Sequence, residues 1–102
     1  MMYQQGDVLL KKVSSIPKDA KPVQRKERGW VLAEGESTGH AHVIEDDIEL
    51  VEKDGILYMT NKESVTIKHE EHKHQTIVPG TYQIGIVKEY DPFEKAIRNV
   101  QD

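Results

Sequence analysis

The dipeptide Asp54-Gly55 is the feature of this 102-residue sequence that most constrains its fold. It stands between two segments, residues 48–53 and 56–60, in which apolar and polar side chains alternate. Asp-Gly favours the type I′ turn, in which both central residues have a positive φ, and this turn joins adjacent antiparallel strands. The sequence therefore predicts a β-hairpin at this point, and with it an antiparallel sheet.

Similar alternation predicts further strands on both sides of the hairpin. In the first of them Val8 and Leu10 share one face, because successive side chains of a strand point to opposite sides. The expected strands are residues 8–13, 30–33, 41–45, 64–69, 75–78 and 81–89. Many short strands separated by turn residues are typical of all-β domains. We expect one mostly β domain over residues 1–102, a small β-barrel or jelly roll with strands between about residues 7 and 90.

The C-terminal residues follow a different pattern. Asp91 suits a helix N-cap, Pro92 suits the first helical position, and Glu94 completes a sequence like a capping box. An apolar stripe at helical spacing follows them. We expect a short C-terminal helix at about residues 92–100, packed on the barrel or on a neighbouring subunit.

Composition bears on the partners and the location of the protein. The net charge of −4 argues against a nucleic-acid surface, and no apolar run approaches the ~18 residues of a membrane span. The N-terminal residues do not form a signal peptide, so we expect a cytoplasmic protein. Hydrophobic residues make up only 36% of the chain. Metal binding or homo-oligomerisation can supply the stability that a small core lacks, and we expect a homo-oligomer.

All five histidines lie in two short groups, at residues 40–42 and 69–74. In a strand, His40 and His42 point to the same face, with their Cα atoms about 7 Å apart. Two imidazoles at this spacing can converge on one metal ion, which then needs a third or fourth ligand from elsewhere. The alternation that turns Ile44 inward turns both histidines inward as well.

The second group is the expected source of the remaining ligands. His69 ends a strand and faces inward by the same alternation. A bulge or bend at Glu70-Glu71 would return His72 and His74 to that side, and the sequence leaves open which of the three histidines completes the site. The alternative interpretation is that the histidines are solvated and bind no metal.

The chemistry of the site follows from the residue types present. The chain has no cysteine, so any metal is held by nitrogen and oxygen ligands, which suit zinc, iron, manganese, nickel or copper(II). The predicted ligands are His40, His42, His69 and His72. Glu70 and Glu71 can ligate the metal directly or accept the second ring N–H of a ligand histidine.

The pattern around the first histidine pair resembles the first motif of the cupins, which has a glycine, a His-x-His pair, a glutamate and a second glycine. The matching positions are Gly35, His40, His42, Glu45 and Gly55. The resemblance covers about residues 35–82 and implies a β-barrel whose metal is held by the two histidines, Glu45 and a later histidine. The run Gly-Glu-x-Thr-Gly-His-x-His, with the later His-Glu-Glu-His, is also similar to small bacterial or phage proteins of unassigned function.

Two kinds of function are compatible with such a site. In the first, the protein is a metal-dependent enzyme acting on a small molecule, with Glu71 or Glu70 as general base and Tyr82 or Tyr90 as proton donor. In the second, it is a non-catalytic metal- or ligand-binding module, or an assembly module, with a structural metal or none. The resemblance does not choose between them, because one fold hosts many activities.

Overall fold

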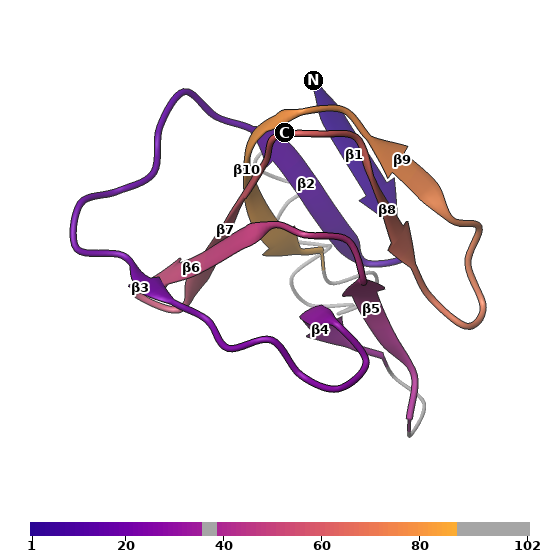
Figure 1. Cartoon of the computed structure of the whole chain (residues 1–102). Helices are drawn as coiled ribbons and strands as arrows, with labels where there is room; N and C mark the ends of the chain where they lie inside the picture. Colours follow the sequence, from indigo (N-terminus) through magenta and orange to yellow (C-terminus); the bar gives the residue numbers. More distant parts are fainter. Residues whose placement is uncertain (36–38, 88–102) are drawn as a thin grey trace, which may run out of the picture.

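The structure is a computed structural model that describes residues 1–35 and 39–87, and these residues form two antiparallel β-sheets (Figure 1). One sheet has six strands in the order β1-β2-β10-β7-β6-β3, and the other has four in the order β4-β5-β8-β9. The bounds are β1 Met2–Gln5, β2 Val8–Lys12, β3 Lys21–Pro22, β4 Trp30–Glu34, β5 Ala41–Ile44, β6 Glu49–Lys53, β7 Ile56–Asn61, β8 Val65–Lys68, β9 Gln75–Ile77 and β10 Gly80–Ile86.

The predicted hairpin is confirmed. β6 and β7 pair in antiparallel register, from Glu49 opposite Thr60 to Lys53 opposite Ile56. The residues between them, Asp54 and Gly55, have φ angles of 52° and 79°. Two successive positive φ angles are what a type I′ turn requires, and both residue types tolerate them.

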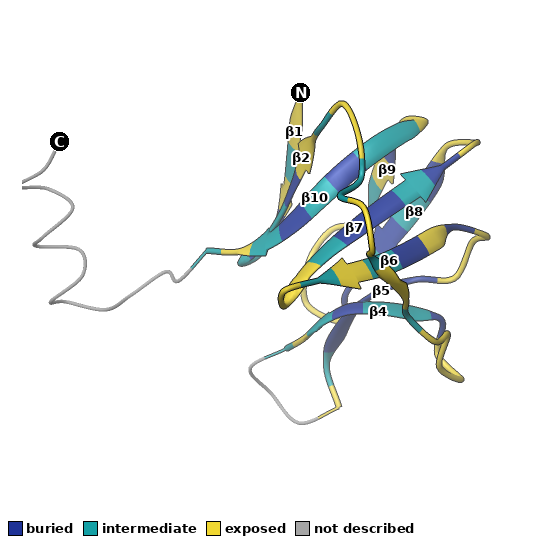
Figure 2. Cartoon of the chain, turned by 90° about the vertical axis from the view of Figure 1, so that its left-hand side faces the viewer, coloured by how far each residue is buried: buried dark blue, intermediate teal, exposed yellow. Residues whose placement is uncertain are grey.

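The core lies between the two sheets. The chain crosses from one sheet to the other after β3, β5, β7 and β9, so both sheets contribute apolar side chains to a shared interior. Figure 2 shows the buried positions as dark stretches along the strands. The six-stranded sheet contributes Val8, Leu10, Leu50, Met59, Tyr82 and Ile84, and the four-stranded sheet contributes Leu32, Ile44, Val65, Ile67 and Ile77. The predicted common face of Val8 and Leu10 is confirmed, and in the structure it is the buried one.

The prediction of a closed β-barrel or jelly roll is wrong. The edge strands β1 and β9 approach each other, but they are joined through side chains and not by a backbone ladder. The Gln75 side-chain amide donates to the carbonyl of Gln4, and the N–H of Val78 donates to the hydroxyl of Tyr3 at 3.2 Å. The two sheets therefore stay separate in residues 1–35 and 39–87.

Two other differences concern the ends of the chain. Strand β1 was not predicted, because residues 2–5 lack a clear apolar alternation. It pairs with β2, and the turn between the two strands contains Gly6, which has a φ of 57°. The predicted helix at residues 92–100 lies outside the described residues. No membrane-spanning helix occurs in the part of the chain that the structure describes.

Candidate metal centre

Four of the five histidines come together beside the end of the four-stranded sheet. The ring centroids of His42 and His69 lie 4.3 Å apart, and those of His69 and His72 lie 4.6 Å apart. The His40 ring is 5.7 Å from that of His69. These four residues are the predicted ligands, and we call them the histidine cluster. His74 is exposed and makes none of these ring contacts.

The two histidines of the His-x-His pair have different environments. Every residue of β5 is buried, so this strand is covered on both faces, and His42 is only 1% exposed. His40 precedes the strand, and 26% of its side chain is exposed. The alternation therefore predicted the neighbourhood of the two rings but not their unequal access to solvent.

The chain of the second histidine group, residues 69–74, leaves the regular strand near Glu70-Glu71, where the sequence allowed a bulge or bend. β8 ends at Lys68, and the backbone N–H of Glu71 then donates to Nδ1 of His69 at 3.0 Å. This local bond turns the chain, so that the ring of His72 returns to the ring of His69. His69 itself is 8% exposed.

Atoms able to bind one metal ion converge at three of these positions. One ligand atom each from His40, His69 and Glu70 lies within 4.8 Å of the others. We call these three residues the candidate metal centre. The group differs from the predicted set, because His42 and His72 are absent from it and a carboxylate takes part.

The carboxylate of Glu70 is held in the ionised form. Its Oε1 accepts the backbone N–H of Ala41 at 3.0 Å, and its Oε2 accepts a hydrogen bond from Arg28. The backbone hydrogen bond from Ala41, followed by one from the backbone of Glu70 itself and by the Arg28 guanidinium, lowers the pKa of Glu70 to about 2. Arg28 also donates to the carbonyl of Gly39 at 2.7 Å, which connects Glu70 to the chain just before His40.

Glycine is required where the backbone passes the candidate metal centre. The N–H of Gly35 donates to the carbonyl of His40 at 2.7 Å. A Cβ at Gly35 would lie 2.8 Å from Cβ of His40 and 2.9 Å from Nε2 of His69. Gly35 therefore lies directly against two candidate ligands.

His42 is oriented by a buried glutamine. The Gln5 side-chain amide donates to the carbonyls of Ile67 and Lys73, at 3.0 and 2.9 Å, so its oxygen is the atom that faces Nδ1 of His42 at 2.9 Å. Nδ1 must therefore carry the ring hydrogen. On the other side of the ring, Nε2 lies 3.4 Å from Oδ1 of Asp7. Burial, followed by the neighbouring His69, lowers the pKa of His42.

The remaining predicted site residues have other surroundings. Glu71 is 64% exposed, with Oε1 3.7 Å from Nδ1 of His40. Tyr82 is buried in the core, where its hydroxyl donates to the carbonyl of Val78 at 2.6 Å and burial raises its pKa. The hydroxyl hydrogen of Tyr82 is therefore already donated to a carbonyl in the core and does not serve the predicted role of proton donor. Glu45 is exposed and pairs with Lys68 at 2.6 Å, which lowers the pKa of Glu45. Tyr90 lies outside the described residues.

Three residues near the histidines were not expected from the sequence: Gln5, Asp7 and Arg28. Gln5 and Asp7 flank the glycine of the β1–β2 turn, and Arg28 belongs to a stretch rich in basic residues. Nothing in their local pattern distinguishes them from solvated polar residues, because the site residues that they contact are distant in the sequence: His42 is 37 positions from Gln5, and Glu70 is 42 positions from Arg28.

A surface cavity of about 300 Å³ adjoins the candidate metal centre. His69 and Glu70 form part of its lining, together with His74, Lys68 and Arg28. The cavity is large enough for a small molecule, and it places part of the candidate metal centre in contact with solvent.

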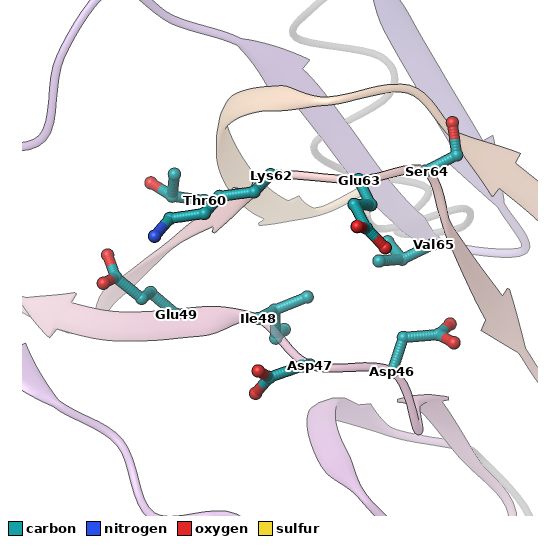
Figure 3. Close-up of a pocket in the computed structure, with 9 residues that line it drawn as sticks. All are labelled: Asp46, Asp47, Ile48, Glu49, Thr60, Lys62, Glu63, Ser64 and Val65. Carbon is teal, nitrogen blue, oxygen red and sulfur yellow. The ribbon is translucent and has the colours of Figure 1, made fainter.

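A second cavity, of about 390 Å³, lies at the turns that join β5 to β6 and β7 to β8 (Figure 3). Its charged lining consists of Asp46, Asp47, Glu49, Lys62 and Glu63, and it has no imidazole. We therefore place the candidate site at the histidines and not here.

The fold and the site together define a small, two-sheet antiparallel β-domain with a cluster of histidines at one end. The chain belongs to the family described as a domain of unknown function, DUF8820, whose model matches residues 4–86. The matched stretch contains every residue of the histidine cluster and of the candidate metal centre. No curated protein and no solved structure gave a match.

Proposed function

We propose that this domain binds a divalent transition metal through His40, His69 and Glu70. The observation that carries the proposal is the convergence of their ligand atoms to within 4.8 Å of one another. Two imidazoles and one carboxylate form a donor set that zinc, iron, manganese, nickel and copper(II) accept. Glu70 suits this role, because its low pKa makes it a carboxylate at neutral pH.

Metal binding at His69 has a defined local cost. A neutral imidazole has a single nitrogen lone pair, and in His69 this lone pair accepts the N–H of Glu71. The ring can give this lone pair either to the backbone or to a metal. Loading the site therefore breaks the Glu71–His69 hydrogen bond and shifts the start of the 69–74 segment.

Glu71 is placed to support His40 as a ligand. Its carboxylate lies 3.7 Å from Nδ1 of His40, close enough for a small rotation of this exposed side chain to form a hydrogen bond. Metal-binding histidines commonly donate their other ring N–H to a carboxylate, which fixes the ring and makes the ligand nitrogen more basic. We assign Glu71 this positioning role in place of the general base expected from the sequence.

Three protein ligands leave room for a further ligand. Catalytic metal sites characteristically keep one position for water or substrate, whereas structural sites are closed. The 300 Å³ cavity beside His69 and Glu70 offers space for a small molecule at this position. The proposed function is therefore metal-dependent binding of a small molecule, with hydrolysis or oxidation of that molecule as the reactions open to such a metal.

The experiment is elemental analysis of the untagged protein, followed by zinc titration of the protein stripped with a chelator. We expect zinc to bind at the candidate metal centre, and His40→Ala or Glu70→Gln should lower the affinity of this position about 100-fold or more, since even indirect partners of ligands contribute about 10- to 100-fold. His74→Ala is the matched control, because it removes an exposed imidazole that lies outside the histidine cluster.

Zinc binding that is unchanged in both stoichiometry and affinity in both variants would refute the assigned ligands. A wild-type protein that binds no metal would leave the histidines as a hydrogen-bonded cluster without a metal. The amide of Glu71 provides an independent check by nuclear magnetic resonance, because its exchange with solvent should accelerate when zinc takes the lone pair of His69.

A further inference from the structure

The pair formed by Asp7 and His42 has two acceptor atoms facing each other. The amide of Gln5 places the ring hydrogen of His42 on Nδ1, so in the neutral ring the lone pair is on Nε2. That lone pair faces a carboxylate oxygen of Asp7 at 3.4 Å. Two facing lone pairs are stable only with a proton or a cation between them, and His42 is shielded from water.

The distance between these two atoms fits a shared metal ion. Nitrogen and oxygen ligands that each lie roughly 2.0–2.2 Å from a tetrahedral zinc ion are about 3.3–3.5 Å apart. A directly hydrogen-bonded imidazolium and carboxylate would be closer, at about 2.7–2.9 Å. The observed 3.4 Å falls in the range for two ligands of one ion and exceeds the range for a direct charged hydrogen bond.

A third ligand can come from His72, which lies beside the same turn, although its ligand atoms do not yet converge with those of Asp7 and His42 to within 4.8 Å. The ring of His72 lies nearly parallel to that of His42, with an angle of 16° and centroids 5.9 Å apart. Its Nε2 rests against Gly6, where a Cβ would be 2.6 Å away, so His72 lies next to the residue that precedes Asp7. His72 is exposed, and the site requires its side chain to rotate toward Asp7.

We propose that Asp7, His42 and His72 bind a second divalent metal ion beside the candidate metal centre. The ligands come from the β1–β2 turn, from β5 and from the 69–74 segment, so this ion ties the first hairpin to the second sheet. Contact between the rings of His42 and His69 makes the two positions neighbours. The inference extends the proposed function, which uses a different set of ligands.

The test is the zinc stoichiometry of the untagged, chelator-stripped full chain, measured by equilibrium dialysis and elemental analysis. We expect two equivalents in the wild type and one each in Asp7→Asn and Glu70→Gln. His72→Ala, at an exposed position, should weaken the second equivalent about 10-fold or more. Asp54→Asn is the matched control, because it makes the same chemical change in a hairpin turn where asparagine also tolerates a positive φ.

The possible outcomes separate this inference from the proposed function. A single equivalent that Glu70→Gln loses and Asp7→Asn keeps would overturn the second position and support the candidate metal centre. A single equivalent that Asp7→Asn loses and Glu70→Gln keeps would support the second position and overturn the candidate metal centre. No zinc binding would overturn both. Urea unfolding of each variant verifies that it is folded.

Discussion

Replacing Gln5 with leucine tests the buried network that orients the histidine cluster. Gln5 is 2% exposed and joins three parts of the chain through one amide. It donates to the carbonyls of Ile67 and Lys73 and accepts from the ring of His42. Leucine has a similar volume but can make none of these hydrogen bonds.

The expected loss can be estimated from the groups that leucine would leave unsatisfied. The carbonyl of Ile67 and the Nδ1–H of His42 are buried, and each unsatisfied buried group costs about 1–3 kcal/mol. The carbonyl of Lys73 is partly buried and can reach water. Allowing for the apolar area that leucine buries, we expect Gln5→Leu to lower the free energy of unfolding by about 2–4 kcal/mol.

The neighbouring residue provides a matched control. Gln4 is exposed, and its side-chain amide donates only to the carbonyl of Gly6 in an exposed hydrogen bond. Gln4→Leu should change the free energy of unfolding by less than about 0.5 kcal/mol. Urea denaturation with a chelator present measures both variants without a contribution from bound metal.

Equal stability of Gln5→Leu and Gln4→Leu would refute the reasoning. Nitrogen chemical shifts of the His42 ring offer a second check on the same network. They should report a hydrogen on Nδ1 in the wild type and on Nε2 in Gln5→Leu, because the carboxylate of Asp7 beside Nε2 is the acceptor that remains when the amide oxygen is removed.

Three further predictions concern single residues. Gly35→Ala should weaken zinc binding about 10-fold or more, because the new Cβ would meet His40 and His69; Gly85→Ala, where a Cβ meets nothing within 4 Å, should leave zinc binding unchanged. The pKa of Glu70 is depressed, so its contribution to the free energy of unfolding is complete above pH 4.5 and is lost as the pH falls toward about 2. The loss of stability between these pH values should therefore be smaller in Glu70→Gln than in the wild type. Gly55→Ala, at a φ of 79°, should lower the free energy of unfolding in urea by about 1 kcal/mol, and an unchanged value would contradict the type I′ turn.

Strand positions were predictable where a local rule applies. The hairpin at Asp54-Gly55 depends on two adjacent residues and their φ angles, so neighbouring sequence is sufficient to define it. The common face of Val8 and Leu10 follows from the two-residue period of a strand, and the structure shows that this face is buried. β1 has neither signal, and its pairing with β2 is evident only in the folded chain.

The shape of the domain was not predictable in the same way. Alternation indicates that a strand has a buried face, but it does not indicate whether the outer strands of two sheets pair. Here β1 and β9 meet through Tyr3, Gln75 and the backbone beside them, so the sheets remain open where a barrel was expected.

The sequence by itself determined that the chain is rich in antiparallel strands, that any metal must be bound by nitrogen and oxygen, and that imidazoles from two distant segments are available. Only the tertiary structure decided that Glu70 joins His40 and His69, and that Gln5 and Asp7 enclose His42. The reason is physical. Periodicity is a property of neighbouring residues, whereas the distance between two ligand atoms depends on the packing of segments from different parts of the chain.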